Sequence, residues 1–223
     1  MNAQHEHEFE AAPGLPERLP AGEVILWQGA PDWRVLAVQA LHVRKLFFYF
    51  AAMLALQALY LAGESGAAMA RPLLTSACMA LLALAMLATT AWFAARTTLY
   101  TLTNKRVVMR IGIVLTLTFN LPLRQIAGAA LRPQAGGFGD IALALKGPDR
   151  IAWLNLWPHA RPWALKNPQP SLRCLADAEQ VGERIQQAWQ AANPGVLAAV
   201  GPVEPSVNPA RYEPDGGART AAV

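Results

Sequence analysis

The chain has 223 residues, of which 54% are hydrophobic and only 15% are charged. Soluble globular domains average about 25% charged residues, so this composition excludes an ordinary soluble protein and indicates a membrane protein with a soluble part. The net charge of +4 suits an anionic membrane surface, but it is too small and too scattered to indicate a nucleic-acid partner. The two cysteines, Cys78 and Cys174, predict no disulfide framework, and the sequence has no metal-ligand spacing.

The part of the chain before the first apolar run divides into two segments. Residues 1–18 are rich in Pro, Glu and Ala, and we expect a flexible N-terminus there. Residues 19–45 contain the apolar run from Val24 to Trp27 between Gly and Pro residues. This pattern predicts a short strand, or a cytoplasmic segment that docks on a folded domain.

Two long apolar runs predict a transmembrane helical hairpin over residues 46–95. The first run, residues 46–62, holds one strongly polar side chain, Gln57, and would be about 26 Å long as a helix. The second run, residues 72–95, has 24 residues and no charge. The connection at 63–71 is short, so we expect two antiparallel neighbouring helices.

Basic residues on both sides of the hairpin predict its orientation. Arg44 and Lys45 precede the first span, and Arg96, Lys105 and Arg106 follow the second. Cytoplasmic flanks carry the excess of Lys and Arg, so both termini and the domain after the hairpin should be cytoplasmic. If the first helix extends upstream, its two basic residues would snorkel to the interface. The basic residues could bind anionic lipid head groups, bind acidic loops of a partner, or only fix the orientation.

After the hairpin, the period of the apolar residues changes to two. Residues 106–111 and 115–120 largely alternate apolar with polar side chains, which is typical of strands that bury one face. Gly, Pro and Asp separate four further expected strands, at 121–126, 128–133, 139–147 and 149–156. Several short strands at regular spacing predict an antiparallel barrel or sandwich.

The C-terminal part of the chain changes back to a helical pattern. Residues 175–192 place Val181, Ile185 and Trp189 on one face, which predicts an amphipathic helix that caps the strands. Residues 193–223 are rich in Pro, Gly and Ala and predict a disordered tail.

Several of these segments resemble a known family. The segments "YTLTNKRVVMRIGI", "LPLRQI" and "GFGDIAL" are similar to the pattern of bacterial PH domains. Within that family, "GEVILWQGAPDW" and "HVRKLFFYF" resemble the photosynthetic complex assembly proteins of purple bacteria. This resemblance extends over most of residues 6–192.

The resemblance implies a fold and a function. The fold would be a two-helix transmembrane hairpin followed, over residues 96–192, by a PH-like antiparallel β-barrel capped by a C-terminal helix. The function would be non-catalytic assembly of the photosynthetic reaction centre and its core light-harvesting antenna in the bacterial inner membrane. The implied partners are reaction-centre and core-antenna subunits, membrane lipids and a second copy of the chain. No cofactor is implied.

An aromatic stretch from Trp153 to Trp163 is the best candidate for a partner surface. We expect Trp153 to be core, placed by its strand. We expect Trp157, His159, Arg161 and Trp163 to be exposed or at the bilayer surface, because Trp and Arg are enriched at interface hot spots. Gln57 is a second candidate, and it could bond either to a partner helix or to its own hairpin.

Three other functions remain open from the sequence. The chain could be a general membrane-surface PH-like module that binds anionic lipid or acts in envelope maintenance. It could deliver bacteriochlorophyll, in which case His42 or His159 would be the candidate ligand. An enzyme is the weakest alternative, because the sequence has no catalytic motif or paired carboxylates.

Overall fold

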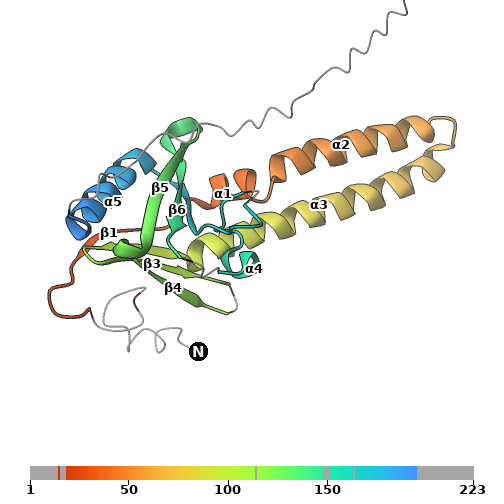
Figure 1. The fold of residues 1–223 in the computed structure, drawn as a ribbon. Helices are drawn as coiled ribbons and strands as arrows, with labels where there is room; N and C mark the ends of the chain where they lie inside the picture. The colour runs from red at the N-terminus through yellow and green to blue at the C-terminus, as the bar shows by residue number, and fades with distance from the viewer. Residues whose placement is uncertain (1–14, 16–18, 114, 148–150, 163, 195–223) are drawn as a thin grey trace, which may run out of the picture.

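The computed structural model describes residues 15, 19–113, 115–147, 151–162 and 164–194 (Figure 1). In chain order its elements are β1 (Ile25–Gly29), α1 (Trp33–Gln39), α2 (Val43–Tyr60), α3 (Gly66–Thr97), β2 (Leu99–Thr103), β3 (Arg106–Ile111), β4 (Leu117–Pro122), the 3-10 helix η1 (Leu123–Gln125), β5 (Ile126–Pro133), the 3-10 helix η2 (Ala135–Gly137), β6 (Gly139–Leu145), α4 (Trp153–Leu156), β7 (Ser171–Leu175) and α5 (Ala178–Ala192). The expected flexible N-terminus and disordered tail lie outside these described residues, apart from Leu15, Asn193 and Pro194.

Helices α2 and α3 form the hairpin, which projects away from the sheets (Figure 1). Both are long and apolar enough to cross a membrane, at about 27 Å and 48 Å. Helix α2 begins at Val43, so it contains the upstream extension and both basic residues. Helix α3 begins at Gly66, six residues before the start that the sequence predicted at residue 72. The residues ahead of Pro72 include three alanines that favour helix, so the loop is shorter than the sequence predicted.

Helix α1 lies in the segment expected to dock, and the sequence analysis did not predict it. Asp32 caps its first turn, because its side chain accepts hydrogen bonds from the Arg34 and Val35 amides. Its buried Leu36 packs against Ala94 and Ala95 of α3, while Ala37 packs in a neighbouring cluster with Ala91. These small α3 residues let the two helices approach closely, so the last turns of α3 belong to the soluble domain's packing.

The strands form two antiparallel sheets in the described residues, with orders β1-β2-β3-β4 and β5-β6-β7. The first sheet thus begins with a strand from before the hairpin. A single closed barrel, as the sequence predicted, is not seen. Pro122 ends β4 without an N–H to extend the ladder, and η1 turns the chain into the second sheet. Gly112 allows the β3–β4 turn, because its φ is 124° and a Cβ would collide with the Leu115 carbonyl oxygen.

The C-terminal elements differ from the sequence prediction in two places. The strand expected at 149–156 is wrong in its described part, where Trp153–Leu156 form the short helix α4. Strand β7 was missed because all five of its residues are buried, so it has no alternation of period two. Helix α5 consequently starts at Ala178, three residues later than expected.

Helix α5 and both sheets share the main hydrophobic core. Val181, Ile185 and Trp189 are buried on the inner face of α5, as the helical period predicted. The Trp189 indole N–H donates a hydrogen bond of 2.9 Å to the Ile126 carbonyl oxygen, which ties α5 to the start of β5. Two antiparallel sheets with a packed C-terminal helix therefore follow two long apolar helices.

Candidate functional site

The joint between the α2–α3 hairpin and the first sheet is a single residue, Thr98, between α3 and β2. His159 lies over this joint. Its Nε2 is 3.0 Å from the Thr98 hydroxyl, and its Nδ1 is 2.6 Å from the Tyr100 hydroxyl. The Tyr100 hydroxyl also accepts a hydrogen bond from the Arg173 amide of β7. Four residues from three separate segments thus hold the helix, the first sheet and the second sheet together.

The hydrogen bonds at the joint fit a His159 tautomer that carries its ring proton on Nε2. Because the Tyr100 hydroxyl accepts from the Arg173 amide, its own proton is available to His159 Nδ1. The Nε2–H then donates to Thr98. Burial, and then the nearby positive charge of Arg173, lower the pKa of His159 from 6.5 to about 3. Burial also raises the pKa of Tyr100 far above its usual range. The side chains of His159 and Tyr100 are therefore both neutral near pH 7.

The position of His159 corrects one expectation from the sequence. We expected an exposed side chain, but His159 is only 1% exposed. Both of its ring nitrogens are engaged, so it cannot bind the magnesium of a pigment while the joint is intact. A histidine in a Trp- and Pro-rich loop gave no sequence signal of this role, because its partners are about 60 residues away in the chain.

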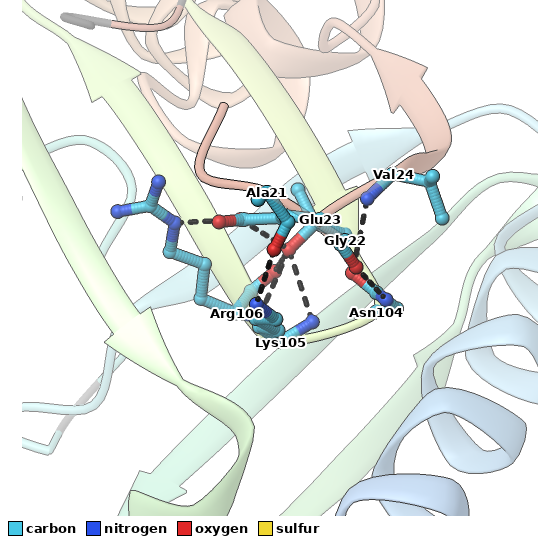
Figure 2. A network of polar contacts seen from close by, with 8 residues as sticks. Ala21, Gly22, Glu23, Val24, Asn104, Lys105 and Arg106 are labelled. Carbon is cyan, nitrogen blue, oxygen red and sulfur yellow. Dashed lines mark hydrogen bonds and ion pairs between the residues drawn. The ribbon is translucent and has the colours of Figure 1, made fainter. Parts of the chain in front are cut away.

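Glu23 holds the start of the first sheet in place (Figure 2). Its carboxylate is 2.7 Å from Arg106 Nε and accepts a hydrogen bond of 2.8 Å from the Thr103 hydroxyl. Asn104 accepts from the Val24 amide and donates to the Gly22 carbonyl oxygen. Burial alone would raise the pKa of Glu23. The hydrogen bonds from Arg106 and Thr103 and the nearby cationic charges hold that pKa below its usual value.

This network changes the interpretation of Lys105 and Arg106, which were expected at the membrane surface. Arg106 is paired with Glu23, and the Lys105 ammonium donates to the Ala21 carbonyl oxygen. Both residues follow the far end of β2, about 16 Å along the strand from α3. They therefore hold β1 on β2 at the end of the strand remote from α3.

The other three basic residues remain at the end of the hairpin nearest the sheets. Arg44 and Lys45 are exposed in the first turn of α2. Arg96 is exposed in the last turn of α3, and its guanidinium lies 4.8 Å from the centre of the Trp92 ring. A tryptophan beside a cation at a helix end is typical of a membrane interface.

A groove of about 700 Å³ lies between α2 and α3 and is mostly apolar. Gln57, Thr75 and Ser76 supply its polar side chains. Within the described residues, the Gln57 side chain makes no hydrogen bond to α3, so the own-hairpin interpretation of Gln57 is not supported. A polar group in an apolar groove can instead bond to a third helix.

The structure places the three described residues of the proposed partner surface, Trp157, His159 and Arg161, in different environments. Trp157 is 44% exposed, as expected. Arg161 is half-buried and donates to the Gln169 side chain at 2.9 Å. Trp163 lies outside the described residues. Leu154 and Leu165 are exposed near this stretch, and the sequence analysis did not single them out, because isolated leucines carry no specific pattern.

Two observations on the described residues concern metal binding and thiol chemistry. No group of three or more His, Cys, Asp or Glu side chains there could hold a metal ion. Burial raises the pKa of the Cys174 thiol to about 12, so it is not a ready nucleophile.

Comparison with known proteins gives one family and one relative. The family model described as "Bacterial PH domain" matches residues 47–189. A protein of Rhodobacter capsulatus is 38% identical over 204 residues, which is 88% of this chain and 94% of that protein. It is described as an uncharacterized 23.7 kDa protein in the puhA 5'region. No solved structure matches the chain.

Proposed function

Since the chain belongs to the bacterial PH domain family, we propose that it is a non-catalytic membrane assembly factor of the PuhB type. Its clients would be the photosynthetic reaction centre and its core antenna, light-harvesting 1. The observation that carries this proposal is the Rhodobacter relative from the puhA region, which points to a photosynthesis-related role. The resemblance of residues 6–192 to photosynthetic complex assembly proteins supports the same function.

The rigid connection between hairpin and sheets supports a scaffolding mechanism. The single-residue link at Thr98, the buried joint at His159 and the packing of α1 on α3 hold the domain in one position on the hairpin. A domain held in this way presents a constant surface where client subunits enter the bilayer. An enzyme acting on a diffusing substrate gains nothing from such a connection.

Two surfaces would make the client contacts. In the membrane, the groove between α2 and α3 would receive a client helix, and Gln57 would bond to it. Outside the membrane, the exposed Trp157 would contact a client segment, because exposed aromatic residues are frequent hot spots. In this arrangement the protein spans the bacterial inner membrane twice, with both termini and the PH-like domain in the cytoplasm. A homodimer is compatible with the same surfaces.

Affinity purification from the native host tests the proposed contacts. Tagged wild-type protein from phototrophically grown cells should retain reaction-centre or core-antenna subunits. Trp157→Ala should lower their recovery about tenfold, as expected for a hot spot. Trp33→Ala should leave it unchanged, because Trp33 is exposed beside Trp92 of α3 and does not line the cavity that contains Trp157. Recovery of no photosynthetic subunit with wild-type protein would favour the general membrane-surface module.

A further inference from the structure

A second cavity, of about 450 Å³, lies where the start of α2 meets the second sheet and the loop after α4. Its lining includes His42 and Lys45 from α2, Arg132 from β5, and Asp140 and Arg173 from β6 and β7. The cavity is separate from the groove between α2 and α3. It shares Trp157 with the proposed client contacts, but those contacts do not use its cationic side chains.

The cavity carries an excess of positive charge. Lys45, Arg132 and Arg173 contribute three cations, against the single carboxylate of Asp140. Arg173 is 6% exposed and Asp140 is 4% exposed, and Arg173 Nε is 3.5 Å from Asp140 Oδ2. Neither of these two atoms makes a hydrogen bond within the described residues. Lys45 and Arg132 have no ion-pair partner in that part of the chain. An anion would therefore balance the cavity's charge.

Four residues that line the cavity hold buried polar atoms without a hydrogen-bond partner in the described part of the chain, although two of these atoms, Arg173 Nε and Asp140 Oδ2, form an ion pair with each other. Two are donors, Trp153 Nε1 and Arg173 Nε. Two are acceptors, Gln134 Oε1 and Asp140 Oδ2. A bare phosphate would satisfy the donors only. A phosphate that carries a polyol would satisfy the buried donors and the buried acceptors, because its oxygens accept from the donors and its hydroxyl groups donate to the acceptors.

The start of α2 adds to the anion site and places it beside the membrane. His42 at the N-cap makes no capping hydrogen bond through its side chain, and the first turn has no acidic residue. Amide N–H groups at such a helix start attract phosphate. Helix α2 is one of the two helices that could cross a membrane. Trp157 and Leu165, which also line the cavity, are 44% and 62% exposed, so apolar surface borders the site.

We propose that this cavity binds the head group of an anionic, hydroxyl-bearing phospholipid of the phosphatidylglycerol type. The phosphate lies among Lys45, Arg132 and the first turn of α2 and accepts hydrogen bonds from Trp153 Nε1 and Arg173 Nε. The glycerol hydroxyls donate to Gln134 and Asp140. The apolar border faces the acyl chains. The bound lipid then bridges the hairpin and the second sheet. This inference is independent of the proposed assembly role, because it needs no client protein.

Native mass spectrometry of the full chain in non-ionic detergent tests the site. The protein is titrated separately with phosphatidylglycerol, phosphatidic acid and phosphatidylcholine of equal acyl length, and with soluble glycerol phosphate. Lys45→Gln and Arg132→Gln remove cations from the cavity lining. Arg44→Gln is the matched control, because Arg44 is the exposed neighbour of Lys45 but does not line the cavity.

The expected result is retention of one phosphatidylglycerol per chain, in preference to the other two lipids. Each cavity variant should weaken that binding about fivefold, as expected for one cation at a membrane surface, and Arg44→Gln should leave it unchanged. Gln134→Ala should reduce the preference over phosphatidic acid. Equal effects of Lys45→Gln and Arg44→Gln would overturn the proposal in favour of surface charge alone. If soluble glycerol phosphate binds, the cavity variants weaken that binding and no lipid is retained, the ligand is a soluble phosphate and the proposal of a membrane lipid is overturned.

Discussion

Removing one hydroxyl group from the joint should destabilise the soluble domain. In Tyr100→Phe, the ring keeps its place in the core, but His159 Nδ1 loses its donor and the Arg173 amide loses its acceptor. Each buried polar group left unpaired costs about 1–3 kcal/mol. The hydrogen bond to His159 Nδ1 is short at 2.6 Å, so its loss should cost more than the loss of the bond from the Arg173 amide, which is long at 3.3 Å. We expect the free energy of unfolding to fall by about 2–4 kcal/mol in total.

Hydrogen–deuterium exchange of the full chain in detergent measures this cost. The loss should appear as faster exchange in β2 and β7, which the joint connects, and not in the distal half of the α2–α3 hairpin. Tyr60→Phe is the matched control, because Tyr60 is 87% exposed at the other end of the hairpin. A change below about 0.5 kcal/mol for Tyr100→Phe would refute the assigned hydrogen bonds, since ordinary surface substitutions produce as much.

Four further predictions follow from named contacts. The pKa of His159 in the folded protein lies below its value in the unfolded chain, so the unfolded chain binds the proton first as the pH falls. The free energy of unfolding is therefore full above pH 6.5 and falls by about 1.4 kcal/mol per pH unit toward pH 3. His159→Gln should flatten this slope in acid titrations. Glu23→Gln should cost about 1–3 kcal/mol and speed amide exchange in β1, because Arg106 loses its charged partner. Ala91→Leu should cost about 1–3 kcal/mol in thermal unfolding by overpacking the contact between α1 and α3. Gln57→Leu should leave thermal stability unchanged but lower client recovery at least about threefold.

Each of these four has a result that would contradict it. An unchanged acid slope in His159→Gln would show that another group controls the pH dependence. Unaltered β1 exchange in Glu23→Gln would mean that the ion pair does not hold this strand. A stable Ala91→Leu variant would indicate that α1 is free to move away from α3. Full client recovery with Gln57→Leu would mean that Gln57 in the groove between α2 and α3 does not contact the client.

Local sequence patterns predicted elements of two kinds. The length of the two apolar runs predicted α2 and α3. Alternation predicted β3, in which Arg106 and Arg110 are half-buried while Val107, Met109 and Ile111 are buried. Strand β7 has no such difference, since both of its faces are buried. Helix α4 has only four residues, too few for any period to show.

The polar contacts that organise the molecule could not be predicted from the sequence. His159 reaches Thr98 across 61 positions, and Arg106 reaches Glu23 across 83. Such pairs depend on how the elements pack, and their local sequences look like an ordinary loop and an ordinary basic turn. For the same reason, Lys105 and Arg106 were expected at the membrane, although β2 carries them away from α3.

Near-infrared absorption of membranes from an in-frame deletion strain tests the assembly role most directly. The strain is compared with a complemented control under phototrophic growth. The account predicts that the reaction-centre or core-antenna bands fall while the peripheral antenna and pigment synthesis persist. Spectra identical to the control under all growth conditions would contradict the assembly role for this chain.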